Sequence, residues 1–459
     1  MPIHPKIGLV NVADPRLGPE WLKRIQADGK RYAAALIKAG VDMVYADQTA
    51  TNDTNAREAL SAINKSSPCG IILRCAWFLR SNVIATLAQE SSIPVLLWAV
   101  PNPNDTAFEA MALSHGALDE LGIAHAVHYG DLSPESLEKI IAWAKACLVK
   151  KTFIGSIYGE IGGRSLEMLP ASSDYNQLRR MFGIHVDPIE QWTLIRMAEQ
   201  IPESEWQAVT AKWKKIFEHV NCNPRSLERS AKFYLAGNRL FQERKWNFAG
   251  IQCQLELIDN YLAPCLPVAM WNDDGFTVAC ETDVNNALGM YLCQLVTGRP
   301  AMFADLFYLD RKTRVIHALN CGTGAPSLAG GTDKSAIEEQ SPLQGTWDEE
   351  KKCSRCQGGA CVRFILPPGP VTLIRFGRIK GEYVIHATEA KAIEHAFNPK
   401  ELGGIAGIWP FAYLQLNPEI DLDTFIGNLR SHHTVIVPGR LAGTVRAFAR
   451  LCDIRVLTQ

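Results

Sequence analysis

The first third of the chain alternates short apolar runs with segments of helical periodicity. Strands are predicted at residues 6–12, 41–45, 70–74 and 94–98, and helices at 18–38, 55–64 and 133–148. Short apolar runs between turns are typical of strands buried on both faces, and their alternation with helices favours a parallel sheet with crossover connections. We therefore expect an α/β domain over residues 1–150.

A second α/β unit is predicted to begin at residue 151, where Lys151-Thr152-Phe153-Ile154-Gly155 has the pattern of its first strand. Later, proline- and glycine-rich pieces at 367–370 and 403–404 separate β-type runs at 371–376 and 382–386. The pattern predicts two Rossmann-like (flavodoxin-like) α/β domains, followed by a mainly β C-terminal domain. The predicted boundaries are 1–150, 151–298 (which carries Glu281) and 299–459 (which carries Asp305 and His433).

Two hydrophobic runs each end in an acid. Glu281 follows the predicted strand 276–280, and Asp305 follows the apolar run 300–304. Helical spacing resumes directly after Glu281, with Thr282 or Asp283 as a plausible N-cap. In open α/β sheets the carboxyl ends of the strands are where ligands bind. Two carboxylates there suggest a divalent cation or a general acid/base pair.

Histidines could complete such a site with nitrogen ligands. His432 and His433 precede an apolar run near the C-terminus, and His317 lies in the segment "TRVIHALNCGTG". By pattern alone, an ordinary core or surface role is favoured over metal ligation for each of them.

Composition narrows the class of protein. Of the 459 residues, 47% are hydrophobic and 21% charged, and the net charge is −1. Without a basic stripe we expect no nucleic-acid partner, and without roughly 18–20 consecutive apolar residues we expect no membrane span. The thirteen cysteines are scattered and the N-terminus lacks a signal-peptide pattern. These features favour a cytoplasmic protein with reduced thiols.

Several ordered motifs resemble the L-fucose isomerase and L-arabinose isomerase family. The metal-site region is similar in "FTVACETDVNNALGMYLCQLVTG", "FADLFY" and "VIHALNCGTGAPS". The segment "SHHTVIVPGRLAGTVRAFARLCDIRV" resembles the end of arabinose-type members, and "IGSIYGEIGGRSLEM" and "FAGIQCQ" resemble segments of the second domain. The resemblance implies a metal-dependent aldose–ketose isomerase that transfers protons through a cis-enediolate.

Carried over residue by residue, the resemblance implies that Glu281, Asp305 and His433 hold Mn²⁺ or another divalent cation. His317 falls where arabinose-type members have a fourth ligand. A divalent ion stabilises the enediolate charge, while one carboxylate removes a proton and its partner returns one. Glu281 and Asp305 are therefore the predicted catalytic residues, and which of them is the base stays open.

The monosaccharide substrate is expected to contact a wider set of side chains. By resemblance, Gln252 matches a substrate-contacting glutamine, while Arg16 and Trp77 match residues that reach the sugar in fucose-type members from a neighbouring subunit. A homo-oligomer with its active site near a subunit interface is therefore expected. His432 and Arg164 are further candidate substrate contacts.

The motifs mix two patterns of the family. The double histidine at His432 and His433 is the arabinose-type pattern, whereas Asp305 is the fucose-type choice, so sugar specificity transfers from neither. Arg16, Arg80 and Arg164 could together bind an anionic substituent, because guanidinium matches a sulfonate by paired hydrogen bonds. A sulfoquinovose-type substrate is therefore considered beside neutral aldoses.

Other functions and sites stay open at the level of sequence. A non-catalytic sugar-binding protein, or a metal-dependent aldolase or epimerase with the same enediolate chemistry, would share much of this pattern. Cys353, Cys356 and Cys361 suggest zinc, but a structural zinc site needs four ligands and free thiols are favoured.

Overall fold

The computed structural model describes residues 4–343, 345–394, 400, 402 and 407–457. These residues divide into two compact units. We call the first the N-terminal unit, which comprises residues 4–152 and 443–453. We call the second the barrel unit, which comprises residues 153–442 and 454–457. Each unit is described by itself.

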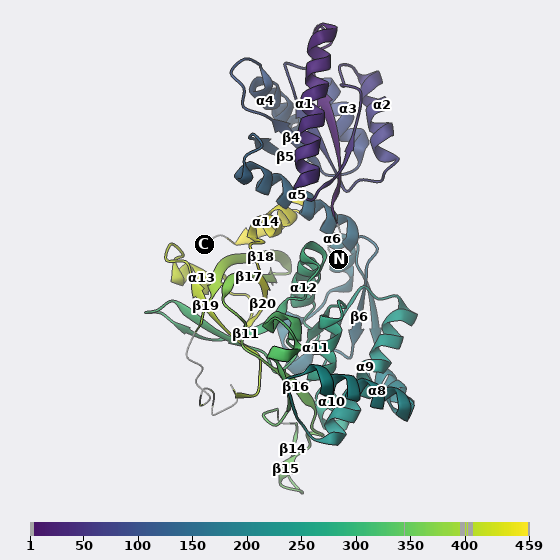
Figure 1. Ribbon diagram of the computed structural model, residues 1–459, viewed down its shortest axis with the longest axis vertical. Coiled ribbons are helices and arrows are strands. Elements are labelled where there is room, and N and C mark those ends of the chain that lie inside the picture. Colours follow the sequence, from purple (N-terminus) through teal and green to yellow (C-terminus); the bar gives the residue numbers. More distant parts are fainter. Residues whose placement is uncertain (1–3, 344, 395–399, 401, 403–406, 458–459) are drawn as a thin grey trace. The chain divides into compact units, whose positions relative to one another are not determined.

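The N-terminal unit is built on a parallel five-stranded sheet of order β2-β1-β3-β4-β5, which is the flavodoxin-like order. Its strands are β1 (Lys6–Val12), β2 (Asp42–Tyr45), β3 (Gly70–Cys75), β4 (Val95–Ala99) and β5 (His125–Tyr129). Its helices are α1 (Pro19–Lys38), α2 (Asp53–Asn64), α3 (Ser81–Ser91), α4 (Ala107–Glu120) and α5 (Pro134–Phe153). Figure 1 shows helices on both sides of this sheet.

Side-chain alternation along β1 explains the two layers of helices. Ile7 and Leu9 join a core with residues of α1 and α5, whereas Val10 and Val12 join a core with α2, α3 and α4. Because successive residues of a strand face opposite sides of the sheet, one apolar run supplies both cores. Burial on both faces thus explains why the strand β1 is a nearly continuous hydrophobic run in the sequence.

The barrel unit begins with a parallel four-stranded sheet of order β10-β9-β6-β7. These strands are β6 (Ile157–Ile161), β7 (His185–Ile189), β9 (Phe248–Ile251) and β10 (Val278–Cys280). The helices of this part are α6 (Tyr175–Phe182), α7 (Gln191–Glu199), α8 (Glu203–Ile216), α9 (Pro224–Arg244), α10 (Glu256–Asn260), α11 (Cys265–Asp273) and α12 (Val284–Thr297). Glu281 directly follows β10 and therefore lies at the carboxyl end of this sheet.

The second sheet of the barrel unit is mainly antiparallel, with the order β17-β20-β11-β12-β19-β18-β21. β17 also pairs with β18, so six of the strands close into a barrel and β21 extends it beside β18. The strands are β11 (Met302–Asp310), β12 (Val315–Leu319), β17 (Gly369–Ile379), β18 (Glu382–Ala392), β19 (Phe411–Leu416), β20 (His433–Pro438) and β21 (Arg455–Leu457). The two parallel sheets and this antiparallel one confirm the predicted fold class.

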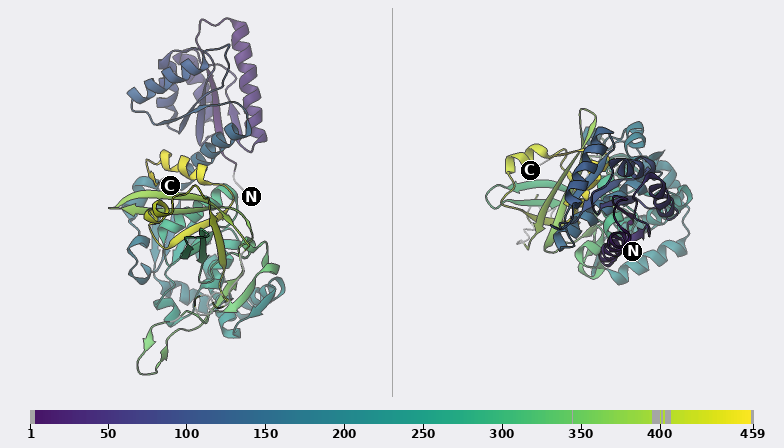
Figure 2. Two further views of the ribbon diagram at one scale, coloured as in Figure 1. Left: turned by 90° about the vertical axis from the view of Figure 1, so that its left-hand side faces the viewer. Right: turned by 90° about the horizontal axis from the view of Figure 1, so that it is seen from above.

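Smaller elements complete the barrel unit. Three strands, β8 (His219–Asn221), β13 (Ala336–Glu339) and β16 (Ala360–Arg363), form a separate sheet, and helix α13 (Leu422–Asn428) precedes β20. The short 3-10 helices are η1 (Ser165–Glu167), η2 (Leu169–Ala171), η3 (Pro326–Ala329) and η4 (Thr332–Lys334). The hairpin of β14 (Trp347–Asp348) and β15 (Cys353–Ser354) extends away from the body of the unit in Figures 1 and 2.

One local prediction was wrong. Residues 151–153 do not open a strand but end α5, and Gly155, with φ of 86°, turns the chain before β6 starts at Ile157. Phe153 is buried and stacks on Tyr291 at 5.6 Å, which explains its apolar character without a strand.

The two compact units do not coincide with the three domains predicted from the sequence. Residues on both sides of position 298 share one core, with Leu266 and Met270 of α11 packed beside Met302 and Ile436 of the barrel. Helix α14 (Ala442–Leu451), near the C-terminus, belongs almost entirely to the N-terminal unit. The division into three domains at 1–150, 151–298 and 299–459 stays a prediction. No helix among the described residues combines the length and apolar character needed to cross a membrane.

Candidate active site

Glu281 is placed by an unusual turn between β10 and α12. Glu281 and Thr282 have φ of 56° and 52°, the left-handed region that is costly for residues with a side chain. The turn is held by the Thr282 amide, which donates to the Ile251 carbonyl at 3.0 Å, and by Asp283, which caps α12 by accepting from the Asn286 amide at 3.1 Å. Such strain persists where surrounding contacts impose it, and it concentrates at functional sites.

Asp305 and His433 are neighbours on two paired strands. In the antiparallel pairing of β11 with β20, Asp305 lies directly opposite His433, so both side chains lie on one face. His433 Nε2 is 3.4 Å from Asp305 Oδ1 and 3.2 Å from Glu281 Oε2. The structure thus brings both carboxylates proposed as metal ligands close to Nε2 of the proposed ligand His433.

The other ring nitrogen of His433 is held by Asp283, a residue predicted only as an N-cap. Asp283 Oδ2 lies 2.7 Å from His433 Nδ1 and 2.6 Å from Arg375 Nη1. Asp283 is fully buried. A carboxylate on one ring nitrogen fixes the orientation and tautomer of a metal-binding histidine and leaves the second nitrogen directed at the metal. Here the second nitrogen is Nε2, which faces Glu281 and Asp305.

Sequence reasoning missed this supporting pair. Arg375 lies within the apolar run of β17, and a charged residue in such a run needs a partner in the core. The charge of Arg375 in an apolar run therefore indicates a buried ion pair. The sequence could not identify Asp283 as the partner, because 92 positions separate the two residues.

The donor set fits a hard or borderline divalent cation. Although 26% of the Asp305 side chain is exposed, its Oδ1 atom is buried and has no hydrogen-bond partner among the described residues. Around an octahedral ion with metal–ligand distances of about 2.1 Å, adjacent ligand atoms are roughly 3.0 Å apart. His433 Nε2 is 3.2 Å from Glu281 Oε2 and 3.4 Å from Asp305 Oδ1, and both distances are close to that value. These three atoms are therefore spaced to bind one cation.

The electrostatics of these residues support the same interpretation. Burial raises the pKa of Asp305 to about 8. Burial lowers the pKa of His433, but hydrogen bonds to Asp283 and Glu281 outweigh it and raise the pKa to about 10. A proton on the ring thus compensates the carboxylates around it, which is the role that a cation would otherwise fill.

His432 lies at the edge of this cluster. The possible ligand atoms of Glu281, His432 and His433 all lie within 4.8 Å of one another, whereas Asp305 is joined to this group through His433. Burial, followed by the charge of His433, lowers the pKa of His432. A neutral imidazole beside the ligands could donate or accept a hydrogen bond from a bound molecule.

Among the described residues, the groups of possible metal ligands do not include His317. Its ring lies against Tyr308 at 5.0 Å and Tyr413 at 4.9 Å, and β11 bulges between Leu306 and Tyr308. Leu319, not His317, is paired with Asp305, and two residues along a strand span roughly 7 Å. A metal role for His317 stays a prediction.

The predicted substrate contacts are distributed over both units. Gln252 accepts from the Gly163 amide at 2.9 Å and so joins the glycine-rich segment next to Arg164, which is exposed. A second glutamine, Gln254, lies 3.5 Å from Glu281 through its side-chain amide. These contacts place Gln252 and Arg164 in the barrel unit, and their predicted contact with the substrate stays a prediction.

Arg16 and Trp77 lie in the N-terminal unit. Arg16 pairs with Asp14 at 2.8 Å, directly after β1, and Trp77 packs on Trp21 at 4.9 Å, after β3. Both follow the carboxyl ends of parallel strands, which is the ligand-binding edge of such a sheet. Their predicted contact with a sugar stays a prediction.

Comparison with known proteins points to sugar isomerases. No family model matches the chain. A sulfoquinovose isomerase from Alkalicoccus urumqiensis is 23% identical over 357 residues, covering 72% of this chain and 75% of the relative. An L-fucose isomerase from Escherichia coli (strain SE11) is 22% identical over 461 residues, covering 81% and 77%. These relatives confirm the family resemblance predicted from the motifs.

A solved solute-binding protein from Burkholderia multivorans aligns with 65% of this chain and 95% of its own, at 11% identity and a TM-score of 0.17. A score that low does not establish a shared fold.

Proposed function

We propose that this chain is an aldose–ketose isomerase whose active site is formed by Glu281, Asp305 and His433. The observation that carries the proposal is the meeting of both carboxylates at His433 Nε2, with Asp283 behind the ring. The names of the relatives, sulfoquinovose isomerase and L-fucose isomerase, support the same class of reaction. A non-catalytic sugar-binding protein has no evident use for such a cluster.

The three residues would hold Mn²⁺ or another divalent cation. When bound, such an ion supplies electrostatic stabilisation of the negative oxygens of an enediolate. Isomerisation moves one proton from C2 to C1 of the sugar and another from the C2 hydroxyl to the C1 oxygen. Glu281 or Asp305 would carry the carbon-bound proton, while His433 is kept in place by Asp283.

The substrate is proposed to be a monosaccharide, neutral or sulfonated. The names of the relatives include both kinds, and Arg164 is an exposed guanidinium next to Gly163, whose backbone amide donates to Gln252. We also propose Arg16, Trp77 and His432 as sugar contacts, a homo-oligomer with the site near a subunit interface, and a cytoplasmic location.

A panel of aldoses tests the proposal. Protein stripped with a chelator should be inactive and regain ketose formation with Mn²⁺, measured by product chromatography on neutral and sulfonated aldoses. Glu281→Gln should lower kcat by about 10³-fold or more, because the isosteric amide can neither accept the proton nor provide a charge. Glu203→Gln, an exposed change on α8, serves as the matched control.

The products separate the alternatives. Carbon–carbon cleavage would show an aldolase, inversion without ketose would show an epimerase, and sugar binding without turnover would show a binding protein. Full activity of Glu281→Gln would remove the role assigned to this carboxylate.

A further inference from the structure

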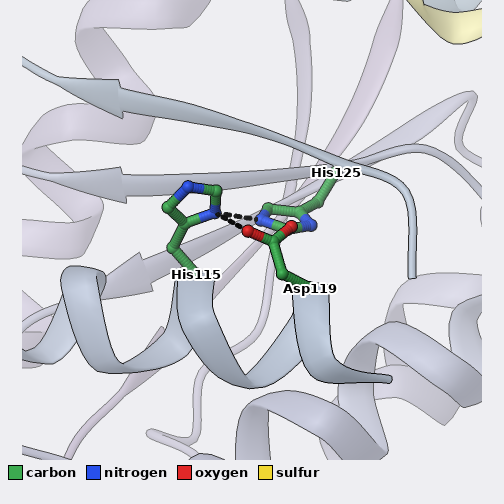
Figure 3. A group of neighbouring side chains, drawn as sticks. All are labelled: His115, Asp119 and His125. Carbon is green, nitrogen blue, oxygen red and sulfur yellow. Dashed lines mark hydrogen bonds and ion pairs between the residues drawn. The ribbon is translucent and has the colours of Figure 1, made fainter. Parts of the chain in front are cut away.

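A second cluster of possible ligands lies in the N-terminal unit. His115 and Asp119 are one helical turn apart on α4, and His125 begins β5, the strand at the end of the sheet order. Figure 3 shows the three side chains directed toward one another. His115 Nδ1 is 2.8 Å from His125 Nε2 and 3.5 Å from Asp119 Oδ2.

A backbone contact sets the tautomer of His125. Its Nδ1 lies 2.7 Å from the carbonyl oxygen of Ile123. A carbonyl only accepts, so Nδ1 carries the hydrogen and Nε2 of the neutral ring presents its lone pair. That lone pair is directed at His115 Nδ1, which also faces Asp119. A backbone carbonyl that orients one nitrogen while the other faces the ligands is the usual support of a metal-binding histidine.

The cluster contains more acceptor atoms than it can satisfy internally. His115 Nδ1 faces both the His125 lone pair and the Asp119 carboxylate, and one N–H can make a good hydrogen bond to only one of them. The ligand atoms of all three residues lie within 4.8 Å of one another. A cation between them would satisfy the three atoms together.

We propose that His115 Nδ1, Asp119 Oδ2 and His125 Nε2 form a binding site for a late first-row divalent cation such as Zn²⁺. Two imidazoles and one carboxylate suit such an ion, with water in a fourth position. Ligand atoms around tetrahedral Zn²⁺ are roughly 3.3 Å apart. The observed 2.8 Å and 3.5 Å lie on either side of that value. Small rotations of the half-exposed side chains are therefore enough to admit the ion.

The site would act as a clip within the fold. It joins the C-terminal part of α4 to the start of β5 across the connecting residues 121–124. Among the described residues β5 pairs with β4, and its other edge has no strand. An ion that binds only the folded state stabilises it by mass action, so this site should resist local opening of β5. It lies in a different unit from Glu281 and does not depend on the proposed isomerase activity.

Calorimetry with ZnCl₂ tests the site. Full-length Glu281→Gln protein, stripped with a chelator, is titrated with and without a second substitution. Adding His115→Gln or His125→Gln should remove one equivalent of bound Zn²⁺. His4→Gln should remove none. His4 is an exposed histidine in the same unit, and its ring nitrogen has a similar contact, 2.8 Å from the Gly40 carbonyl oxygen.

Three further measurements protect the test against unfolding. Circular dichroism in chelator should show the same spectrum for every variant, and Asp119→Asn, which keeps both rings, should weaken Zn²⁺ binding about tenfold or more. Hydrogen exchange of β5 should slow with Zn²⁺ only where both histidines are present. The proposal is overturned if folded His125→Gln protein binds as many equivalents as its parent, or if His4→Gln loses an equal number.

Discussion

At the scale of single residues, one imidazole organises the candidate active site. His433 contacts Asp283 through one ring nitrogen and Glu281 and Asp305 through the other. Burial disfavours a charge on Asp283, yet Arg375 and His433 together keep its pKa below the usual value. Asp283 is therefore ionised, and its charge can hold the ring in place from the side opposite the proposed metal.

Asp283→Asn tests this positioning role. The amide keeps the shape but loses the charge that fixes the tautomer of His433, so we expect the Mn²⁺ concentration for half-maximal activity to rise about 10- to 100-fold. Activity as a function of Mn²⁺ concentration provides the measurement. Asp423→Asn, an exposed change on α13 whose partner is Arg311, is the control.

A loss of stability alone would not change the Mn²⁺ concentration needed for half-maximal activity. Removing the charge also leaves Arg375 without its carboxylate, which can cost about 3–5 kcal/mol. The urea midpoint of Asp283→Asn is therefore measured beside its activity. A lower midpoint with an unchanged Mn²⁺ requirement would assign Asp283 to folding only.

At the scale of elements, the pairing of strands decides which polar groups are buried. β18 pairs with β17 along its whole length, and α13 covers His386 with the Phe425 ring at 5.4 Å. His386 is buried beside Thr388, whose hydroxyl lies 3.1 Å from the ring. Burial, followed by the charge of Arg430, lowers the pKa of His386 to about 4. The barrel thus contains a histidine that stays neutral in the folded state.

The folded protein should lose stability as pH falls from about 6.5 to 4. In this window the unfolded chain protonates His386 at its ordinary pKa, whereas the folded chain does not until about pH 4. The loss in free energy of unfolding due to His386 is absent above about pH 6.5 and reaches about 3 kcal/mol near pH 4. In urea unfolding, the difference in midpoint between pH 7.5 and 5.0 should shrink in His386→Gln.

His219→Gln is the matched control for this titration, because His219 is exposed on β8. It should leave the pH difference unchanged. An equal pH dependence in wild type and His386→Gln would show that other groups cause the acid sensitivity.

At the scale of the whole molecule, the chain leaves the N-terminal unit after α5 and returns to it near the end. Lys150 of α5 donates to the Leu451 carbonyl at 2.5 Å, and Leu451 packs against the core that contains Trp143. Residues 443–453 therefore complete a unit that begins more than 400 positions earlier. Contacts so distant in sequence favour slow closure of this unit during folding.

Phe448→Ala should destabilise the N-terminal unit, although the residue lies near the end of the chain. Phe448 is fully buried in α14, and removal of a buried phenylalanine costs about 3–5 kcal/mol. Hydrogen exchange should become faster in β1 than in β17, with Arg450→Ala, an exposed change on the same helix, as the control. Faster exchange in β17 alone would place the helix energetically with the barrel.

Local sequence patterns were sufficient to predict much of the fold. The alternation of strands and helices, the end of β10 at Cys280, and the start of α12 behind an Asp283 cap follow from short-range spacing and turn chemistry. The misplaced strand at 151–153 shows the limit, because an apolar run that ends a buried helix has the same local pattern as a short strand.

The sequence by itself determined which residues could carry chemistry and where along each strand they lie. Only the tertiary structure decided which of them meet: His433 Nε2 between Glu281 and Asp305, Asp283 with Arg375 behind the ring, and His317 among aromatic rings instead. Such pairings join positions tens to more than a hundred residues apart, and they depend on strand order and register. Local spacing carries no information about either, because both are set by how the hydrophobic faces of distant elements pack together.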